Sequence, residues 1–149
     1  MTTPTLLPGN RFRAYRGDGA TPTNWAFLCL GTSVTLTLTN AFEDATVPDC
    51  DEPLKIPVRK SVLSSTSWGG RIAGQVDATR LAKLRADAES QTPVLYQFRV
   101  DQSAANGGGA WTGTVFVENL EIAKTNNGIV GFTCQFRGDG ALAWADAAA

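Results

Sequence analysis

Histidine is absent from the 149 residues of this chain, and charged residues make up only 18% of them. Without histidine the chain lacks the side chain that most often serves as a general base in enzymes. No serine lies in the G-x-S-x-G turn that presents the nucleophile of many hydrolases. The formal net charge of -1 also lacks the basic excess of a dedicated nucleic-acid binder. We therefore expect no catalytic residues and predict that the chain is not an enzyme.

Cysteine is scarce as well. Cys29, Cys50 and Cys134 are odd in number and scattered, which argues against a disulfide framework or a zinc site. We interpret Cys29 and Cys134 as small apolar residues packed in strands. The acidic segment 43–52 lacks the residue order of a calcium loop, and glycines 107–109 lack the lysine of a phosphate loop. Neither a metal nor a cofactor is expected.

Long apolar runs are missing, so the sequence predicts neither a signal peptide nor a membrane anchor, and we expect folding in a cytoplasm. Hydrophobic residues amount to 43% of the chain, and its length suits one domain over residues 1–149 with one sizeable core. Residues 1–9 are expected to form an N-terminal arm, and residues 138–149 a C-terminal tail.

Strand periodicity is the main positive signal. Val34, Leu36 and Leu38 alternate with threonines, which is typical of a strand with one apolar and one wet face. Further strands are predicted at residues 11–16, 25–30, 61–76, 94–100, 110–124 and 129–137. In the segment 110–124 the apolar parity switches, which predicts a β-bulge near Asn119. Asn127-Gly128 predicts a tight hairpin.

One helix is predicted at residues 78–89, with Asp77 as its N-cap and Leu81 and Leu84 on its apolar side. Its outward positions are expected to be Arg80, Lys83, Arg85 and Asp87. The predicted fold is therefore mostly β, an antiparallel β-sandwich or rolled barrel with one flanking helix.

The segment 41–59 has no strand periodicity and is rich in proline. A loop of this length inside a compact domain is usually functional. Its acidic residues are Glu43, Asp44, Asp49, Asp51 and Glu52.

The order of these features resembles a known family. A Gly-Thr-Ser-Val-Thr-Leu strand start at 31–36 leads into the long acidic loop, followed by Trp68-Gly69-Gly70-Arg71 and the short helix. The strands 110–120 and 131–136 then precede Arg137-Gly138-Asp139-Gly140. Nearly the whole chain beyond the N-terminal arm resembles the major tail tube proteins of long-tailed bacteriophages and gene transfer agents. It is more distantly similar to contractile-tail and type VI secretion tubes.

This resemblance implies six-fold rings that stack into a tube of the virion tail, assembled in the host bacterial cytoplasm. Each subunit would supply four inner strands, at residues 33–39, 61–76, 110–124 and 129–137. A barrel of about 24 strands closes at a diameter of roughly 45–50 Å, which admits double-stranded DNA. The loop 41–59 and the termini would reach the next ring. Tape-measure, tail terminator and tail-tip proteins would be the other partners.

A wall that lets DNA slide should not bind phosphates, because cationic rings release counterions and hold DNA. The polar strand faces supply hydroxyls, amides and carboxylates, and the predicted lumen-facing residues are Thr35, Thr37, Thr39, Ser65, Ser67, Thr112, Thr114, Glu118 and Gln135. Val34, Leu36, Leu38, Phe132 and Phe136 are expected to face the core. Arg71 and Arg137 share the polar parity, and we expect nearby carboxylates to neutralise them.

A second hypothesis is a carbohydrate- or receptor-binding β-sandwich of a virion, from a tail tip or a capsid decoration. The tryptophans at positions 25, 68, 111 and 144 would then form a sugar-stacking platform. The strand periodicity instead places most of them among apolar neighbours.

Overall fold

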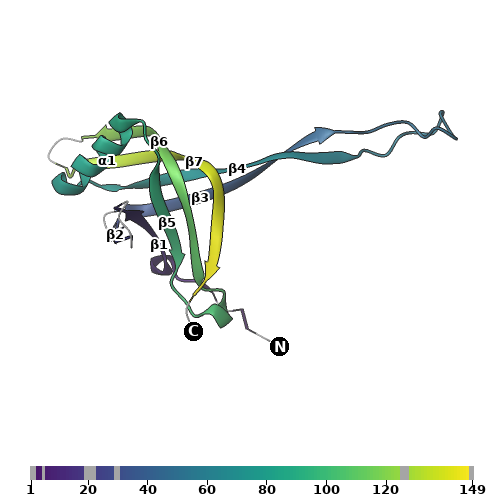
Figure 1. Cartoon of the computed structure of the whole chain (residues 1–149). Coiled ribbons are helices and arrows are strands. Elements are labelled where there is room, and N and C mark those ends of the chain that lie inside the picture. Colours follow the sequence, from purple (N-terminus) through teal and green to yellow (C-terminus); the bar gives the residue numbers. More distant parts are fainter. Residues whose placement is uncertain (1–2, 5, 19–22, 29–30, 125–127, 148–149) are drawn as a thin grey trace.

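The computed structural model describes residues 3–4, 6–18, 23–28, 31–124 and 128–147. In chain order the elements are η1 (Gly9–Arg11), β1 (Phe12–Gly17), β2 (Trp25–Phe27), β3 (Gly31–Asp44), β4 (Ser61–Gln75), α1 (Ala78–Ser90), β5 (Val94–Val100), η2 (Ala104–Asn106), β6 (Gly109–Ala123) and β7 (Gly131–Asp146). The seven strands form one antiparallel sheet in the order β2-β1-β5-β6-β7-β4-β3 (Figure 1). The fold is mostly β with one α-helix in the described residues, as predicted.

The sheet rolls around one apolar core. Ala14 on β1 and Ile72 on β4 belong to the same buried cluster, although three strands separate β1 from β4 in the sheet order. The rings of Phe98 and Phe136 stack inside it with their centroids 5.3 Å apart. Cys134 is fully buried in this cluster, which confirms its predicted role as a small apolar residue. Cys29 lies outside the described residues.

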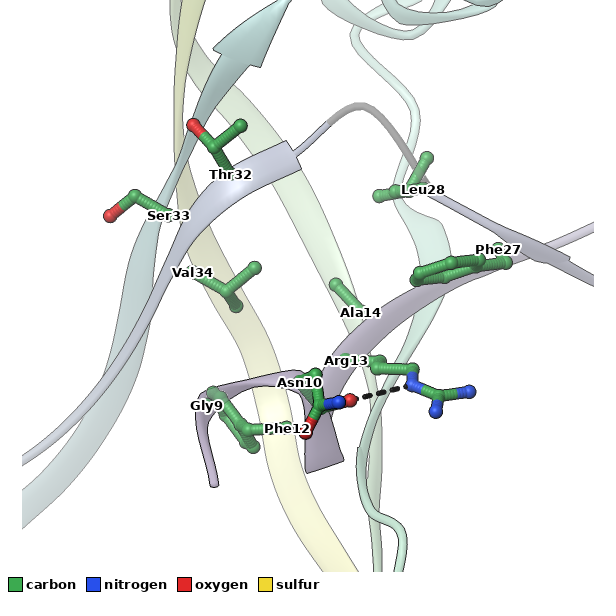
Figure 2. A pocket seen from close by; sticks show the side chains of 10 residues that line it. All are labelled: Gly9, Asn10, Phe12, Arg13, Ala14, Phe27, Leu28, Thr32, Ser33 and Val34. Atoms are coloured by element: carbon green, nitrogen blue, oxygen red, sulfur yellow. Dashed lines mark hydrogen bonds between the residues drawn. The ribbon is translucent and has the colours of Figure 1, made fainter. Parts of the chain in front are cut away.

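The roll does not close into a hydrogen-bonded barrel. β1 and β3 lie on either side of an open groove of about 780 Å³, into which Phe12, Ala14 and Val34 project (Figure 2). Arg13 at the same groove donates from Nε to the backbone oxygen of Asn10 at 2.9 Å. The sheet therefore keeps two edge strands, β2 and β3.

The predicted bulge is present in β6. Val117 pairs with Phe136, but the next partner pair is Asn119 with Gln135, so β6 contains one extra residue at this point. The bulge lets Leu120 and Val117 both pack against the core. The switch in apolar parity along the sequence is thus the direct signature of this irregularity.

The β3-β4 hairpin extends far beyond the body of the domain (Figure 1). The sequence predicts a loop from residue 41, but β3 continues to Asp44, which pairs with Ser61, and only residues 45–60 are without strand structure. Backbone pairing needs no apolar alternation, so this part of the ladder carries no periodic signal. Leu38 is predicted to face the core and lies on the same side as Trp68, but it is 60% exposed because it is already part of the projecting arm.

The last strand is longer than predicted. The sequence indicates a strand that ends at residue 137 and a free tail, whereas β7 runs from Gly131 to Asp146 and pairs with β6 throughout. The glycines that suggest a turn form a second irregularity instead, with Gly140 at φ 76°. A Cβ on Gly138 would lie 2.2 Å from the indole of Trp68, so only glycine allows this close packing. Trp68 Nε1 donates to the carbonyl of Gly140 at 2.9 Å.

Helix α1 lies where the sequence places it, and Leu84 is buried in the core while Leu81 is half-buried. Asp77 occupies the N-cap position but makes no capping hydrogen bond through its side chain; its carboxylate lies 3.7 Å from Arg80 Nε. No helix in the described residues is long and apolar enough to cross a membrane.

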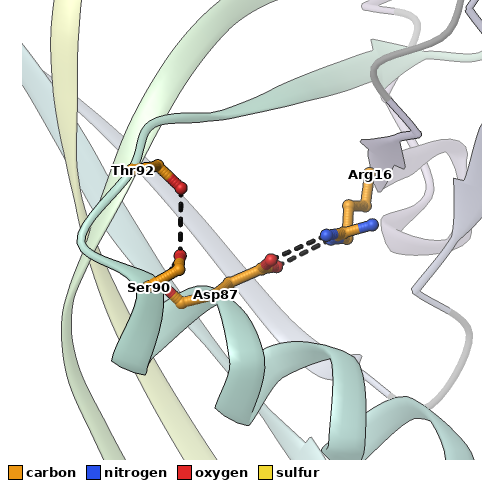
Figure 3. A network of polar contacts seen from close by, with 4 residues as sticks. All are labelled: Arg16, Asp87, Ser90 and Thr92. Atoms are coloured by element: carbon orange, nitrogen blue, oxygen red, sulfur yellow. Dashed lines mark hydrogen bonds and ion pairs between the residues drawn. The ribbon is translucent and has the colours of Figure 1, made fainter.

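Asp87 is predicted to face solvent but is only 6% exposed. It accepts a bidentate pair of hydrogen bonds from Arg16 on β1, at 2.7 Å from Nε and 2.6 Å from Nη2 (Figure 3). Its backbone carbonyl also accepts from Ser90 Oγ, which contacts Thr92 Oγ1 at 3.0 Å. Asp87 follows Leu84 by three positions and thus lies on the same helix face, where Arg16 compensates its charge.

Candidate assembly and lumen surfaces

One side of the β6-β7-β4-β3 unit, here called the polar face, is lined by hydrophilic residues. Thr35 pairs with Arg71, which in turn pairs with Gln135. Asn119 completes this row on β6. Directly paired residues project to the same side of a sheet, so the row forms one continuous polar strip. The adjacent row projects into the core and consists of Val34, Ile72, Cys134 and Leu120.

The polar face is hollowed into an open depression of about 650 Å³. Six of the nine predicted lumen residues line it, namely Thr35, Thr37, Thr39, Ser67, Glu118 and Gln135. They come from all four strands of the unit, although they are spread over a hundred positions of the sequence. The tertiary structure therefore gathers most of the predicted set on one concave surface.

The other three predicted residues lie outside this depression. Ser65 sits on the projecting arm, opposite Ala41. Thr112 accepts a hydrogen bond from Gln97 Nε2 at 3.3 Å, and Thr114 donates to the carbonyl of Asp139 at 2.9 Å. Both threonines lie on the half of β6 that pairs with β5, away from the centre of the polar face.

The two arginines of the polar face differ in their surroundings. Arg137 Nη2 donates to Glu118 Oε1 at 2.9 Å, so this arginine has the carboxylate partner that the sequence predicts. Arg71 has no carboxylate partner among the described residues, contrary to the same prediction. Its nearest neighbours on the polar face are the uncharged Thr35 and Gln135.

Sequence reasoning missed three polar residues of this face. Asn119 pairs with Gln135, and Glu121 pairs with Thr133, so all of them project on the polar side. The signal was available in the sequence, because a bulge near Asn119 shifts the parity of every later residue of β6 to the other side.

Both sides of the four-strand unit present unpaired backbone. β3 is an edge strand over its whole length. On β6, pairing with β5 ends at Val115, which lies opposite Val94. Residues 116–123 of β6 therefore pair only with β7. Such edges are templates for pairing with another chain.

The arm carries the predicted acidic residues. Glu43 and Asp44 lie in β3 itself, and Asp49, Asp51 and Glu52 lie in the loop that follows. Hydrogen bonds from the hydroxyl and the backbone N–H of Thr46 lower the pKa of Asp44 below its ordinary value. The hydroxyl of Thr46 also accepts from the backbone N–H of Lys60 at 2.9 Å, which closes the base of the loop.

The arm is also richer in exposed apolar side chains than its acidic composition suggests. Phe42 and Leu63 pair on the side that continues the core face, and they are 61% and 52% exposed. At the loop the exposed aliphatic residues are Val47, Leu54, Ile56 and Val58. An exposed apolar surface of this kind marks an interaction site.

No tryptophan platform and no metal centre is formed by the described residues. Trp68 is buried, and Trp25 lies on β2 at the far end of the sheet. Trp111 and Trp144 contact one another with ring centroids 4.5 Å apart. The same described residues contain no cluster of three or more side chains suited to hold a metal ion.

No protein family profile and no curated protein matches this chain. Its structure is similar to solved structures. A chain in the tail of an empty gene transfer agent particle, a structure with C6 symmetry, superposes with a TM-score of 0.75 at 14% identity over 94% of this chain and 99% of that one. The SPP1 tail tube gives a TM-score of 0.59 at 11% identity, over 95% of this chain and 80% of that one.

The likeness extends to contractile systems. The sheath/tube terminator structure of an extracellular contractile injection system, PVC, contains a chain that matches with a TM-score of 0.64 at 12% identity over 97% of this chain and 99% of that one. In each case the match covers nearly all of this chain. The chain thus has the fold that these tail and tube structures share.

Proposed function

We propose that this chain is the subunit of a tail tube, in which rings of six copies stack into a conduit for DNA in a virion tail. The observation that carries the proposal is the four-strand unit with a concave polar face and a free backbone edge on each side. The likeness to tail tube structures supports the same reading. Neither feature suggests a reaction, and the proposed role is structural.

The free edge of β3 in one copy can pair with the free edge of β6 in the next copy around a ring. The unit contains four antiparallel strands, and an even number of them leaves β3 and β6 running in opposite directions. A rotation about the tube axis places β3 of one copy beside residues 116–123 of β6 in the next copy, and this junction is again antiparallel. Such a head-to-tail contact closes into a ring and pairs both free edges of the four-strand unit.

The exposed apolar side chains of the arm fit the same assembly. Leu38, Phe42 and Leu63 continue the core face beyond the body of the domain, where each remains more than half exposed. In the ring a neighbouring copy buries this surface. Full burial of a large apolar side chain contributes about 1.5–3 kcal/mol, and these side chains, which are 52–61% exposed in the subunit, gain roughly half of that in the ring, which favours assembly.

The loop 45–60 is proposed to contact the next ring. It lies at the far end of the arm, well beyond the body of the subunit (Figure 1). Its carboxylates pair with basic groups of that ring, and its exposed aliphatic residues pack beside them. The N-terminal residues are proposed to take part in the same stacking, and tape-measure, terminator and tail-tip proteins to bind the ends of the tube.

The polar face is proposed to line the bore. Threonine hydroxyls and amides dominate it, and Glu118 neutralises Arg137. DNA that passes through such a wall meets no ring of free lysines that would hold its phosphates. Passage is transient and independent of sequence.

Negative-stain electron microscopy of the purified chain tests the proposal. We expect rings or tubes with a bore, and discrete monomers at high protein concentration would contradict it. Discrete monomers that bind glycans would instead support the carbohydrate-binding hypothesis.

Removal of residues 44–53 tests the role of the arm separately. This deletion is expected to leave a folded subunit that does not polymerise. As a matched control, replacement of Asp49, Asp51 and Glu52 by their amides keeps the loop length and removes only charge. Normal tubes from the deletion would show that the arm does not join the rings.

A further inference from the structure

Two opposite charges on the polar face have no ion-pair partner among the residues that the structure describes. Arg71 on β4 and Glu121 on β6 are both exposed, and neither forms an ion pair with a described residue. Arg137 and Glu118 on the same face form a close pair. The polar face therefore carries one close ion pair, while Arg71 and Glu121, like the carboxylates of Glu43 and Asp139 on the same side, form no ion pair with a described residue.

The two unpaired side chains lie near opposite sides of the four-strand unit. Arg71 pairs with Thr35 of the edge strand β3 and is thus one strand away from that edge. Glu121 lies on the free edge of β6 itself. In a head-to-tail ring these two sides of the unit meet, so Arg71 of one copy and Glu121 of the next lie on either side of every junction between copies.

We propose that Arg71 of each copy forms an ion pair with Glu121 of the adjacent copy on the luminal side of the ring. This inference rests on the proposed tube and identifies a specific contact at its subunit junction. The partner is a second copy of this chain, and the contact is made by one residue from each side of its interface.

The geometry of a sheet allows the contact. The polar faces lie on one side across the junction only if Glu121 pairs with a residue of β3 that also projects to the polar side. Ser33, Thr35 and Thr37 of the neighbour meet this condition, and these are the registers that the proposed contact requires. Two strand spacings and two residues along the strand separate the Cβ atoms by about 12 Å. Extended arginine and glutamate side chains together span roughly 10 Å, and a charge-assisted hydrogen bond of about 2.8 Å closes the remainder.

Within one copy, Arg71 and Glu121 are also two strands apart, but different side chains stand between them. Thr133 and the longer Gln135 of β7 stand between Arg71 and Glu121 in the subunit, and the structure leaves both charges unpaired. Across the junction the intervening strand is β3, whose polar side offers only short hydroxyl side chains near Arg71.

The pair has a consequence for the bore. An unpaired Arg71 in every copy would place a cationic ring in each layer of the tube, and cationic rings bind DNA strongly. Pairing with Glu121 neutralises that ring at the moment of assembly. Ring closure thereby produces a wall on which both arginines have carboxylate partners.

Charge reversal on separate chains tests the inference. Arg71→Glu alone places two glutamates at every junction, and Glu121→Arg alone places two arginines there. Each variant is expected to assemble at least ten-fold less than the wild type. An equal mixture of the two restores opposite charges at every junction of a ring in which they alternate, and six positions permit this alternation. Monomer stability is checked by urea unfolding, and Glu118→Arg mixed with Arg71→Glu serves as a control that should not complement.

Complementation by the mixture, measured as pelletable tubes and by electron microscopy, supports the inter-subunit pair. Recovery only when both reversals are on the same chain would indicate a pair within the subunit and overturn the inference. Normal assembly of either single variant would overturn it as well. All these outcomes require that the wild type assembles, so failure of the proposed tube itself is recognised separately by monomeric wild-type protein.

Discussion

Replacement of Asp87 by asparagine is expected to destabilise the subunit by about 3 kcal/mol. The Asp87 side chain is 6% exposed and that of Arg16 is 22% exposed, and two short hydrogen bonds join them. Removal of one partner from a buried ion pair typically costs about 3–5 kcal/mol because the remaining charge is left uncompensated. Since Arg16 keeps some contact with water, we expect the lower end of this range.

This magnitude is a large fraction of the stability of an ordinary domain, which is about 5–15 kcal/mol. For a chain of this size it lowers the melting temperature by roughly 6–12 °C. Urea unfolding followed by tryptophan fluorescence, at a concentration where sedimentation shows only monomer, measures the free energy directly. Trp68 is a suitable reporter because it is buried in the core.

Two further variants test whether the destabilisation by Asp87→Asn is due to breaking a buried ion pair or to losing a charge anywhere in the protein. Glu118→Gln breaks the exposed pair with Arg137, whose side chains are 48% and 71% exposed, and should cost less than about 1 kcal/mol. The double variant Arg16→Met with Asp87→Leu should recover most of the loss, because no charge remains buried. A free energy of unfolding for Asp87→Asn within about 1 kcal/mol of the wild type would refute the reasoning.

Three other substitutions test separate parts of the structure. Leu84→Ala is expected to cost about 2–5 kcal/mol in urea unfolding, because Leu84 is only 5% exposed, and an unchanged midpoint would show that the helix does not complete the core. Thr37→Lys is expected to leave folding and tube assembly intact but to slow DNA ejection, most at low salt, whereas a misfolded variant would place Thr37 in the interior. Burial raises the pKa of Cys134 from 9.0 to about 11, so its thiolate is rare at pH 8.5 and iodoacetamide should label it only after unfolding. Because the pKa of this thiol is higher in the folded than in the unfolded chain, its contribution to the free energy of unfolding is fully present below pH 9 and is lost as the pH rises toward 11. Rapid labelling of the native protein, in a variant that lacks Cys29 and Cys50, would contradict the burial of Cys134.

Local periodicity was sufficient to predict much of the fold. The strict alternation around Val34 and Leu36 identified β3 and its two faces, and the paired leucines located the helix. The parity switch in β6 located a bulge that the register of β6 and β7 confirms. The signal for each of these features lies within about a dozen consecutive residues, because the backbone geometry of a strand or helix decides which side chains in that stretch share a face.

Six of the predicted lumen residues share a concave face for the same reason. Alternation decides the side of a strand on which a residue lies, and the pairing of strands in the sheet brings these sides together into one face. Thr112 and Thr114 have the correct parity but lie on the half of β6 that pairs with β5. The alternation of residues along a strand predicts the side on which each residue lies, but it does not predict which neighbouring strand pairs with each part of a long strand.

The amino-acid sequence by itself thus determined the elements, their faces and the mostly-β class of this protein. Only the tertiary structure decided that Asp87 is buried against Arg16, because those residues are 71 positions apart and no local pattern couples them. It also decided that Gly138 and Gly140 continue a strand, since the packing of Trp68 leaves no room for a side chain on Gly138 and the positive φ of Gly140 favours glycine. The projecting arm and the unpaired Arg71 are likewise properties of the folded sheet, because edges and partners exist only once the strands have been ordered in space.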